Sequence, residues 1–135
     1  MHRIKLACVI DDDPIYIFAI KRLFKRKNFT SNFIIYNNGN EAFKGIKERL
    51  KNGEQLPDII LLDINMPVMD GWQFLEDYKK LKIEKKIPIY VTSSSIKKSD
   101  VEKAQGDNFV RNYVNKPINK ENLDFLIEDF KKVDL

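Results

Sequence analysis

Residues 58–63, with the sequence DIILLD, place four consecutive apolar side chains between two aspartates. Successive side chains of a strand point to opposite faces of its sheet, so this run is apolar on both faces. Such a run is typical of a parallel strand that helices cover on both sides. Four further apolar runs lie elsewhere along the chain, at residues 4–10, 33–36, 87–91 and 110–114. Together the runs predict five strands.

Amphipathic stretches alternate with these runs. Leu123, Ile127 and Phe130 recur at helical spacing in the last of these stretches, and the earlier ones show similar patterns. Asp13-Pro14 combines a capping aspartate with a proline in the first helical turn, which indicates a helix start. Strand–helix alternation repeated five times predicts an α/β fold. We expect a five-stranded, doubly wound parallel sheet with right-handed crossovers and helices on both faces.

Length and composition limit the possible classes of protein. The chain has 135 residues, of which 43% are hydrophobic and 33% are charged. These values predict one domain with a real core, and they exclude a disordered chain or a large multi-domain enzyme. The apolar runs are too short to cross a bilayer, so we expect no membrane insertion. The single cysteine, Cys8, cannot form an internal disulfide, which favours a cytoplasmic location.

The net charge of +4 raises the question of nucleic-acid binding. The densest basic cluster falls within residues 21–27, in the second half of the first predicted helix. Cations are favoured at the carboxyl end of a helix, and no aromatic residues alternate with these to stack on bases. We therefore interpret the cluster as a solvated helix face and expect no DNA partner.

Acidic residues follow two of the predicted strands. Asp11, Asp12 and Asp13 come directly after the first strand, and Asp63 comes directly after the third. Ligands of doubly wound sheets bind outside the carboxyl ends of the strands, so these groups converge at one edge. Asp13 is explained as the helix cap, whereas the other three form a hard-oxygen site suited to Mg²⁺. Taken one at a time, each acid also fits a simple capping role.

Hydroxyl and ammonium groups follow the remaining strands at the same edge. A hydroxyl cluster at residues 92–95 comes after the fourth strand, and Lys116-Pro117 comes after the fifth. Taken alone, the hydroxyl residues fit a turn, and the lysine fits an exposed surface charge. With the carboxylates and a divalent cation, they form a constellation for phosphoryl transfer to an aspartate. No glycine-rich phosphate loop occurs in the chain.

These residues resemble the receiver domain of two-component response regulators, in particular the small stand-alone chemotaxis type. The matching segments are residues 9–13 (VIDDD), 58–71 (DIILLDINMPVMDG), 87–93 (IPIYVTS) and 113–117 (YVNKP). The run LLDINMPVMDG is highly specific, and the likeness extends over essentially the whole chain. The resemblance implies a flavodoxin-like fold and a single receiver domain over residues 1–135 with no attached output domain.

The resemblance also implies roles for particular residues. Asp63 would be the phosphoacceptor, and Lys116 would pair with the phosphoryl oxygens. Asp11, Asp12 and Asp63, with the backbone carbonyl of Asn65, would hold Mg²⁺. The remaining roles belong to a conformational switch: Ser93 would be its hydroxyl and Tyr113 its aromatic ring.

Thr92 stands beside Ser93, and because neighbouring strand residues face opposite ways, only one of the two hydroxyls can serve as the switch.

The expected function is therefore a signalling switch. A sensor histidine kinase or a histidine phosphotransfer protein would phosphorylate Asp63, and the protein would signal by contact with an unknown downstream protein through the face of its fourth helix, fifth strand and fifth helix. Such a protein is no enzyme beyond slow self-catalysed phosphorylation and dephosphorylation. The alternative is a Mg²⁺-dependent phosphatase with an aspartyl-phosphate intermediate. Enzymes of that kind need a second aspartate two residues after the nucleophile, where this chain has Asn65.

Overall fold

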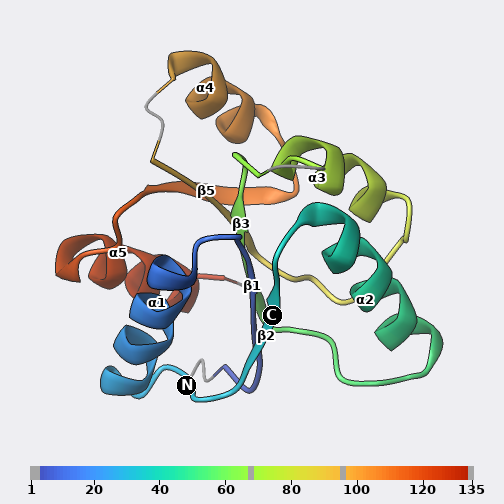
Figure 1. Cartoon of the computed structure of the whole chain (residues 1–135), viewed down its shortest axis with the longest axis horizontal. Helices are drawn as coiled ribbons and strands as arrows, with labels where there is room; N and C mark the ends of the chain where they lie inside the picture. Colours follow the sequence, from blue (N-terminus) through green and yellow to red (C-terminus); the bar gives the residue numbers. More distant parts are fainter. Residues whose placement is uncertain (1–3, 67–68, 95–96, 134–135) are drawn as a thin grey trace.

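The computed structural model describes residues 4–66, 69–94 and 97–133, so Pro67, Val68 and Ser95 lie outside the described residues. Within the described part, five parallel strands form one sheet in the order β2-β1-β3-β4-β5 (Figure 1). The strands are β1 (Ala7–Ile10), β2 (Phe33–Tyr36), β3 (Ile59–Asp63), β4 (Ile89–Ser93) and β5 (Val110–Asn115). The predicted five-stranded doubly wound parallel sheet is confirmed.

Five helices alternate with the strands and cover both faces of the sheet (Figure 1). They are α1 (Pro14–Arg26), α2 (Gly39–Lys51), α3 (Gly71–Lys79), α4 (Lys98–Gly106) and α5 (Lys120–Lys131). The side chains of α1 and α5 pack on one face, whereas those of α2, α3 and α4 pack on the other. Burial on both faces explains why the 58–63 run has no polar residue between its two aspartates.

The strand order places a topological switch point between β1 and β3. The chain moves outward from β1 to β2, then returns past β1 to β3 and continues in the opposite direction. Ile10 of β1 pairs with Leu62 of β3, so the residues that follow them, Asp11 and Asp63, leave the sheet side by side. This is the position at which doubly wound sheets bind their ligands.

Side-chain caps fix where several helices begin at this edge. Asp13 accepts a hydrogen bond from the amide of Ile15 at 3.0 Å, which confirms its predicted role as the cap of α1. Asp70 caps α3 through the amide of Gln73 at 2.8 Å. The basic residues at 21–27 lie in the second half of α1 and at its carboxyl end, as the sequence predicted.

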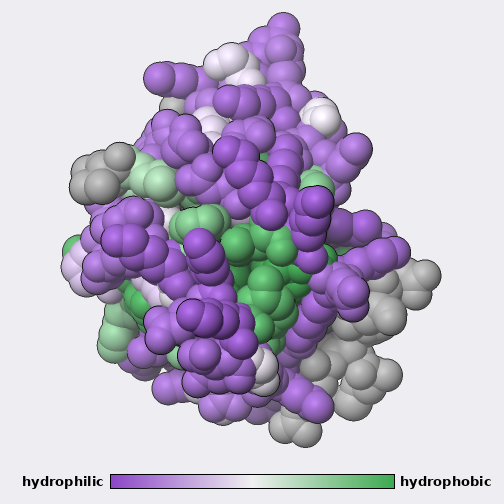
Figure 2. Space-filling model, turned by 90° about the vertical axis from the view of Figure 1, so that its right-hand side faces the viewer, coloured by the Kyte–Doolittle hydropathy of each residue, from purple (hydrophilic) through white to green (hydrophobic). Residues whose placement is uncertain are grey.

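Most of the face drawn in Figure 2 is hydrophilic. On the face drawn in Figure 2, hydrophobic residues gather in one patch that hydrophilic residues surround. Among the described residues, no helix has the length and apolar character that crossing a membrane requires.

Candidate functional site

Asp11 is fully buried at the carboxyl end of β1. Its Oδ1 accepts a hydrogen bond from the amide of Asp13 at 2.9 Å, which holds the turn into α1. Its Oδ2 is also buried and receives no well-aligned hydrogen bond from the described residues. The ammonium of Lys116 is its close partner, with 2.6 Å between Nζ and Oδ2. A buried carboxylate oxygen with spare capacity is suited to a cation.

Asp63 is the last residue of β3 and is 4% exposed. Its Oδ1 accepts a hydrogen bond from the amide of Asn65 at 3.0 Å, and its Oδ2 accepts one from Lys116 Nζ at 3.3 Å. Asp12 is exposed beside these groups. One carboxylate oxygen from each of Asp11, Asp12 and Asp63 lies within 4.8 Å of the others. The acids that the sequence grouped are therefore brought together as an acidic pocket that could bind a metal ion.

Lys116 reaches this pocket from the end of β5. Its side chain is 12% exposed, and its ammonium lies between the carboxylates of Asp11 and Asp63. The backbone at this point is held by a hydrogen bond from the Lys116 amide to the carbonyl of Ser93 at 3.0 Å. The peptide bond between Lys116 and Pro117 is cis.

Burial governs the electrostatics of the pocket. It raises the pKa of Asp11 and of Asp63 above the usual aspartate value, although the Lys116 ammonium and backbone amides oppose the rise. For Lys116, burial disfavours the charged form, but the close contact with the Asp11 carboxylate and the negative charge of that group outweigh it and raise the lysine pKa. Three carboxylates thus face one ammonium, and a further positive charge would stabilise their ionised forms.

Ser93 is buried at the end of β4, near the carboxylates. Asn65 Nδ2 donates a hydrogen bond to its Oγ at 2.7 Å. A side-chain hydrogen bond with Ser93 also acts on Tyr113 of β5, where it opposes the rise in pKa that burial causes. Ser93 therefore connects Asn65, two residues after Asp63, with the aromatic ring on β5. The sequence analysis used only the backbone of Asn65 and did not foresee this side-chain connection.

Thr92 faces the other side of the sheet, where its hydroxyl interacts with Tyr16 of α1. Adjacent strand residues alternate in direction, so the structure separates the two hydroxyls that the sequence left as alternatives. Ser93, rather than Thr92, shares a face with Asn65 and Tyr113.

The structure shows why glycine follows aspartate in the Asp70-Gly71 pair that ends the sequence motif: Gly71 lies against the backbone at the end of β3. A methyl group on its Cα would lie 2.6 Å from the carbonyl oxygen of Asp63 and 2.7 Å from the Cα of Ile64. Real side-chain carbons do not approach backbone atoms so closely, so only glycine lets α3 begin against the end of β3. The closeness of α3 fixes the backbone that carries Asp63.

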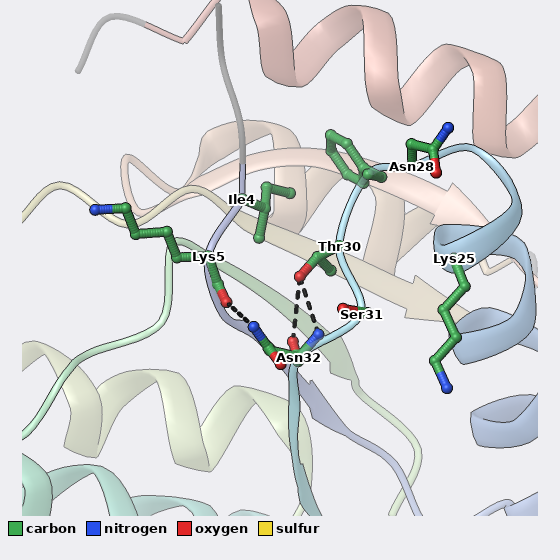
Figure 3. Close-up of a pocket in the computed structure, with 8 residues that line it drawn as sticks. Ile4, Lys5, Lys25, Asn28, Thr30, Ser31 and Asn32 are labelled. Carbon is green, nitrogen blue, oxygen red and sulfur yellow. Dashed lines mark hydrogen bonds between the residues drawn. The ribbon is translucent and has the colours of Figure 1, made fainter.

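The pocket in Figure 3 lies at the opposite end of the sheet, between the start of β1 and the loop from α1 to β2. It has a volume of about 400 Å³. Its polar groups bond to one another: Thr30 Oγ1 accepts a hydrogen bond from the Asn32 amide at 3.1 Å, and Asn32 Nδ2 donates to the Lys5 carbonyl at 3.1 Å. The side chains of Lys5 and Lys25 extend away from these bonds (Figure 3). These bonds hold the loop in place.

Comparison with known proteins agrees with this geometry. The family model of the response regulator receiver domain matches residues 7–128, and the chain belongs to this family. Receiver domains are phosphoacceptor signalling domains of two-component systems rather than classical enzymes, and they act with histidine kinases or phosphotransfer proteins. The family predicted from the sequence motifs is therefore confirmed.

Curated relatives share moderate identity with the chain. A probable methanogenesis regulatory protein, FilR2 of Methanothrix harundinacea, is 28% identical over 92% of this chain and 79% of its own length. The sensor histidine kinase CheAY of Helicobacter pylori is 35% identical over 65% of this chain. The match spans only 11% of CheAY, so the kinase activity named for that protein is not carried over.

Solved structures share the fold. A two-component response regulator from Cytophaga hutchinsonii is 27% identical with a TM-score of 0.85, and the match covers 98% of this chain and all of that one. A response regulator receiver protein from Dyadobacter fermentans has a TM-score of 0.78 at 23% identity, with 96% of this chain and 99% of that chain covered. The second likeness shows the fold alone.

Proposed function

We propose that this chain is the phosphoacceptor switch of a two-component phosphorelay, with Asp63 as the residue that takes the phosphoryl group. The observation that carries the proposal is the position of the Asp63 carboxylate. It lies at the strand-end switch point, is 4% exposed, and shares the Lys116 ammonium with Asp11. The donor is a sensor histidine kinase or a histidine phosphotransfer protein, and we expect both partners to meet in the cytoplasm.

The proposed reaction is a single phosphoryl transfer. A carboxylate oxygen of Asp63 attacks phosphorus, so that a P–O bond forms while the P–N bond of the donor phosphohistidine breaks. The electron pair of that bond returns to the donor imidazole, which leaves and takes up a proton. Lys116, already 3.3 Å from Asp63, donates hydrogen bonds to the transferred oxygens and offsets their charge.

The donor set fits Mg²⁺, which prefers one or two carboxylates together with waters and phosphate oxygens. Asp11, Asp12 and Asp63 would hold the ion with the backbone carbonyl of Asn65, and the buried Oδ2 of Asp11 has spare capacity to accept it. When bound, the ion supplies positive charge that balances the phosphoryl oxygens.

Ser93 and Tyr113 are the proposed switch. Phosphoryl oxygens at Asp63 would accept a hydrogen bond from the Ser93 hydroxyl, which already accepts one from Asn65 and is also bonded to Tyr113. A change at Ser93 would then alter the position of the ring on β5, next to α4. Coupling of this kind is worth about 1–3 kcal/mol, and it would bias the face of α4, β5 and α5 toward one arrangement. A downstream protein would bind that face.

The decisive experiment for the phosphoacceptor is labelling with a matched control. Asp63→Asn should abolish phosphorylation by acetyl phosphate or a cognate kinase, measured as acid- and base-labile label. Asp58→Asn, at the opposite end of β3, should retain it. Equal labelling of both variants contradicts the assignment. Catalytic turnover of small phosphomonoesters, in place of stoichiometric labelling, would favour the phosphatase alternative.

The switch is tested by NMR with Mg²⁺ and beryllofluoride, which mimics the phosphoryl group. Addition should shift the signals of Ser93, Tyr113 and α5 in the wild-type chain. Ser93→Ala should keep the shifts near Asp63 and lose those at Tyr113, whereas Ser94→Ala, an exposed neighbour, should retain both sets. Full shifts at Tyr113 in Ser93→Ala would remove the serine from the mechanism.

A further inference from the structure

Tyr16 contacts the ammonium of Lys116 directly. The Lys116 Nζ lies 4.4 Å from the centroid of the Tyr16 ring, in addition to its two carboxylate partners. The face of an aromatic ring carries partial negative charge and attracts a cation within about 6 Å. The ring therefore forms an uncharged wall of the ammonium site, and Asp11 and Asp63 form its anionic walls.

The ring is held firmly. Tyr16 is the third residue of α1, whose start is fixed by the Asp13 cap and Pro14. Its side chain is 6% exposed and belongs to the core cluster between the sheet, α1 and α5. Burial and the nearby Asp11 carboxylate raise the pKa of its hydroxyl, so the phenol stays neutral. A rigid neutral ring beside a flexible lysine restricts where the ammonium can lie.

The contact with the ring affects how the Lys116 ammonium can act in the proposed mechanism. With only Asp11 and Asp63 as partners, the ammonium would be drawn wholly into ion pairs, and Asp11 already holds it at 2.6 Å. The ring attracts the ammonium through its face and accepts none of its three N–H groups in a conventional hydrogen bond. The contact with the ring therefore uses none of the N–H groups that oxygen acceptors need.

On the basis of the proposed function, we propose that Tyr16 is a positioning residue, whose ring face holds the Lys116 ammonium where it can bind the phosphoryl oxygens on Asp63. The sequence analysis did not single out Tyr16, because a buried tyrosine in an amphipathic helix reads as an ordinary core residue. Only the structure, which brings the first turn of α1 to the residue that follows β5, reveals the contact.

The test compares three variants. Tyr16→Phe keeps the ring face and loses only the hydroxyl, whereas Tyr16→Met fills the space with a flexible chain and removes the ring. Tyr78→Met makes the same replacement at a buried tyrosine of α3, on the other face of the sheet. We expect Tyr16→Met to lower the rate of phosphorylation by acetyl phosphate about tenfold, and Tyr16→Phe to stay within about twofold of wild type. Tyr78→Met should keep the wild-type rate even if it is less stable.

A second measurement does not require the Tyr16→Met variant to fold. The ring current of Tyr16 should shift the Lys116 side-chain methylene protons upfield in wild type and in Tyr16→Phe. Absence of that shift in the wild-type protein overturns the inference, as does a Tyr16→Phe variant that is as slow as Tyr16→Met. A folded Tyr16→Met with the wild-type rate also overturns it while leaving the proposed function intact. If the wild-type chain is not labelled at all, the proposed function itself fails, and this inference fails with it.

Discussion

Asp58 and Asp63 stand at opposite ends of β3, five residues apart, and their environments differ in kind. Asp58 Oδ2 accepts hydrogen bonds from the amides of Lys5 and Leu6 at 2.8 and 3.1 Å, and its Oδ1 pairs with Lys85 at 2.7 Å. These partners outweigh burial and lower the pKa of Asp58. At Asp63 burial is the stronger effect, and the pKa is raised.

The difference separates a structural carboxylate, Asp58, from the proposed phosphoacceptor, Asp63. Asp58 is provided with enough donors to stay ionised, so its charge ties the start of β1 to β3. Asp63 shares one ammonium with Asp11 and lies beside Asp12, so the folded chain alone does not satisfy its charge. A pocket whose negative charge is not fully compensated attracts cations and ligands that bind together with a cation.

Addition of Mg²⁺ should produce the largest difference in stability between variants at the two ends of β3. Bound at about a hundredfold excess over its dissociation constant, a ligand raises the free energy of unfolding by about 2.7 kcal/mol. We expect a gain of that order in the wild-type chain and in Asp58→Asn, and little or none in Asp11→Asn. Thermal unfolding with Mg²⁺ and with a chelator measures it. Equal gains in all three proteins would place the ion elsewhere.

Without metal, substitutions at Asp58, just before β3, and at Asp63, its last residue, should change the free energy of unfolding in opposite directions. Asp58→Ala removes an ion pair and two backbone hydrogen bonds and should lower the free energy of unfolding by about 1–3 kcal/mol. Asp63→Asn removes a buried charge that the raised pKa marks as destabilising, so it should raise the free energy of unfolding. Urea unfolding at pH 7 in a chelator gives both values. A loss of stability in Asp63→Asn would show that its charge is well compensated.

Acid should remove the effects of the two substitutions over different pH intervals. The pKa of Asp63 in the folded chain lies above its usual value of 3.8, so its penalty is present at neutral pH and disappears as the pH falls through that raised pKa toward 3.8. The gain from Asp63→Asn should shrink over that interval. The folded pKa of Asp58 lies below 3.8, so its contribution persists there and is lost only at lower pH. Urea unfolding repeated at several pH values checks both trends.

The strands could be predicted from the sequence, but their ends depended on partners that it does not display. The first strand was expected from residue 4, yet β1 begins at Ala7, because the amides of Lys5 and Leu6 bond to Asp58. The fourth was expected over residues 87–91, whereas β4 is Ile89–Ser93. Pro88 has no N–H group for the ladder, and the hydroxyl residues read as a turn in fact extend the strand.

The candidate site was predictable as far as strand ends determine it. The carboxyl ends of parallel strands meet at one edge, so Asp11, Asp12, Asp63 and Lys116 could be grouped without coordinates. Contacts that depend on side-chain direction could not. The bond from Asn65 to Ser93 and the ring of Tyr16 beneath Lys116 have no sequence signal, because both residues suit a loop or a core equally well.

Gly71 sets a limit on how this protein can be altered by design. Because the first atom of any side chain there would collide with the backbone of Asp63 and Ile64, substitution would displace the end of β3 itself. A library randomised around the pocket and selected for function should therefore diversify at exposed Ser94 far more readily than at position 71. The first turn of α3 therefore fixes the backbone of Asp63, the proposed phosphoacceptor.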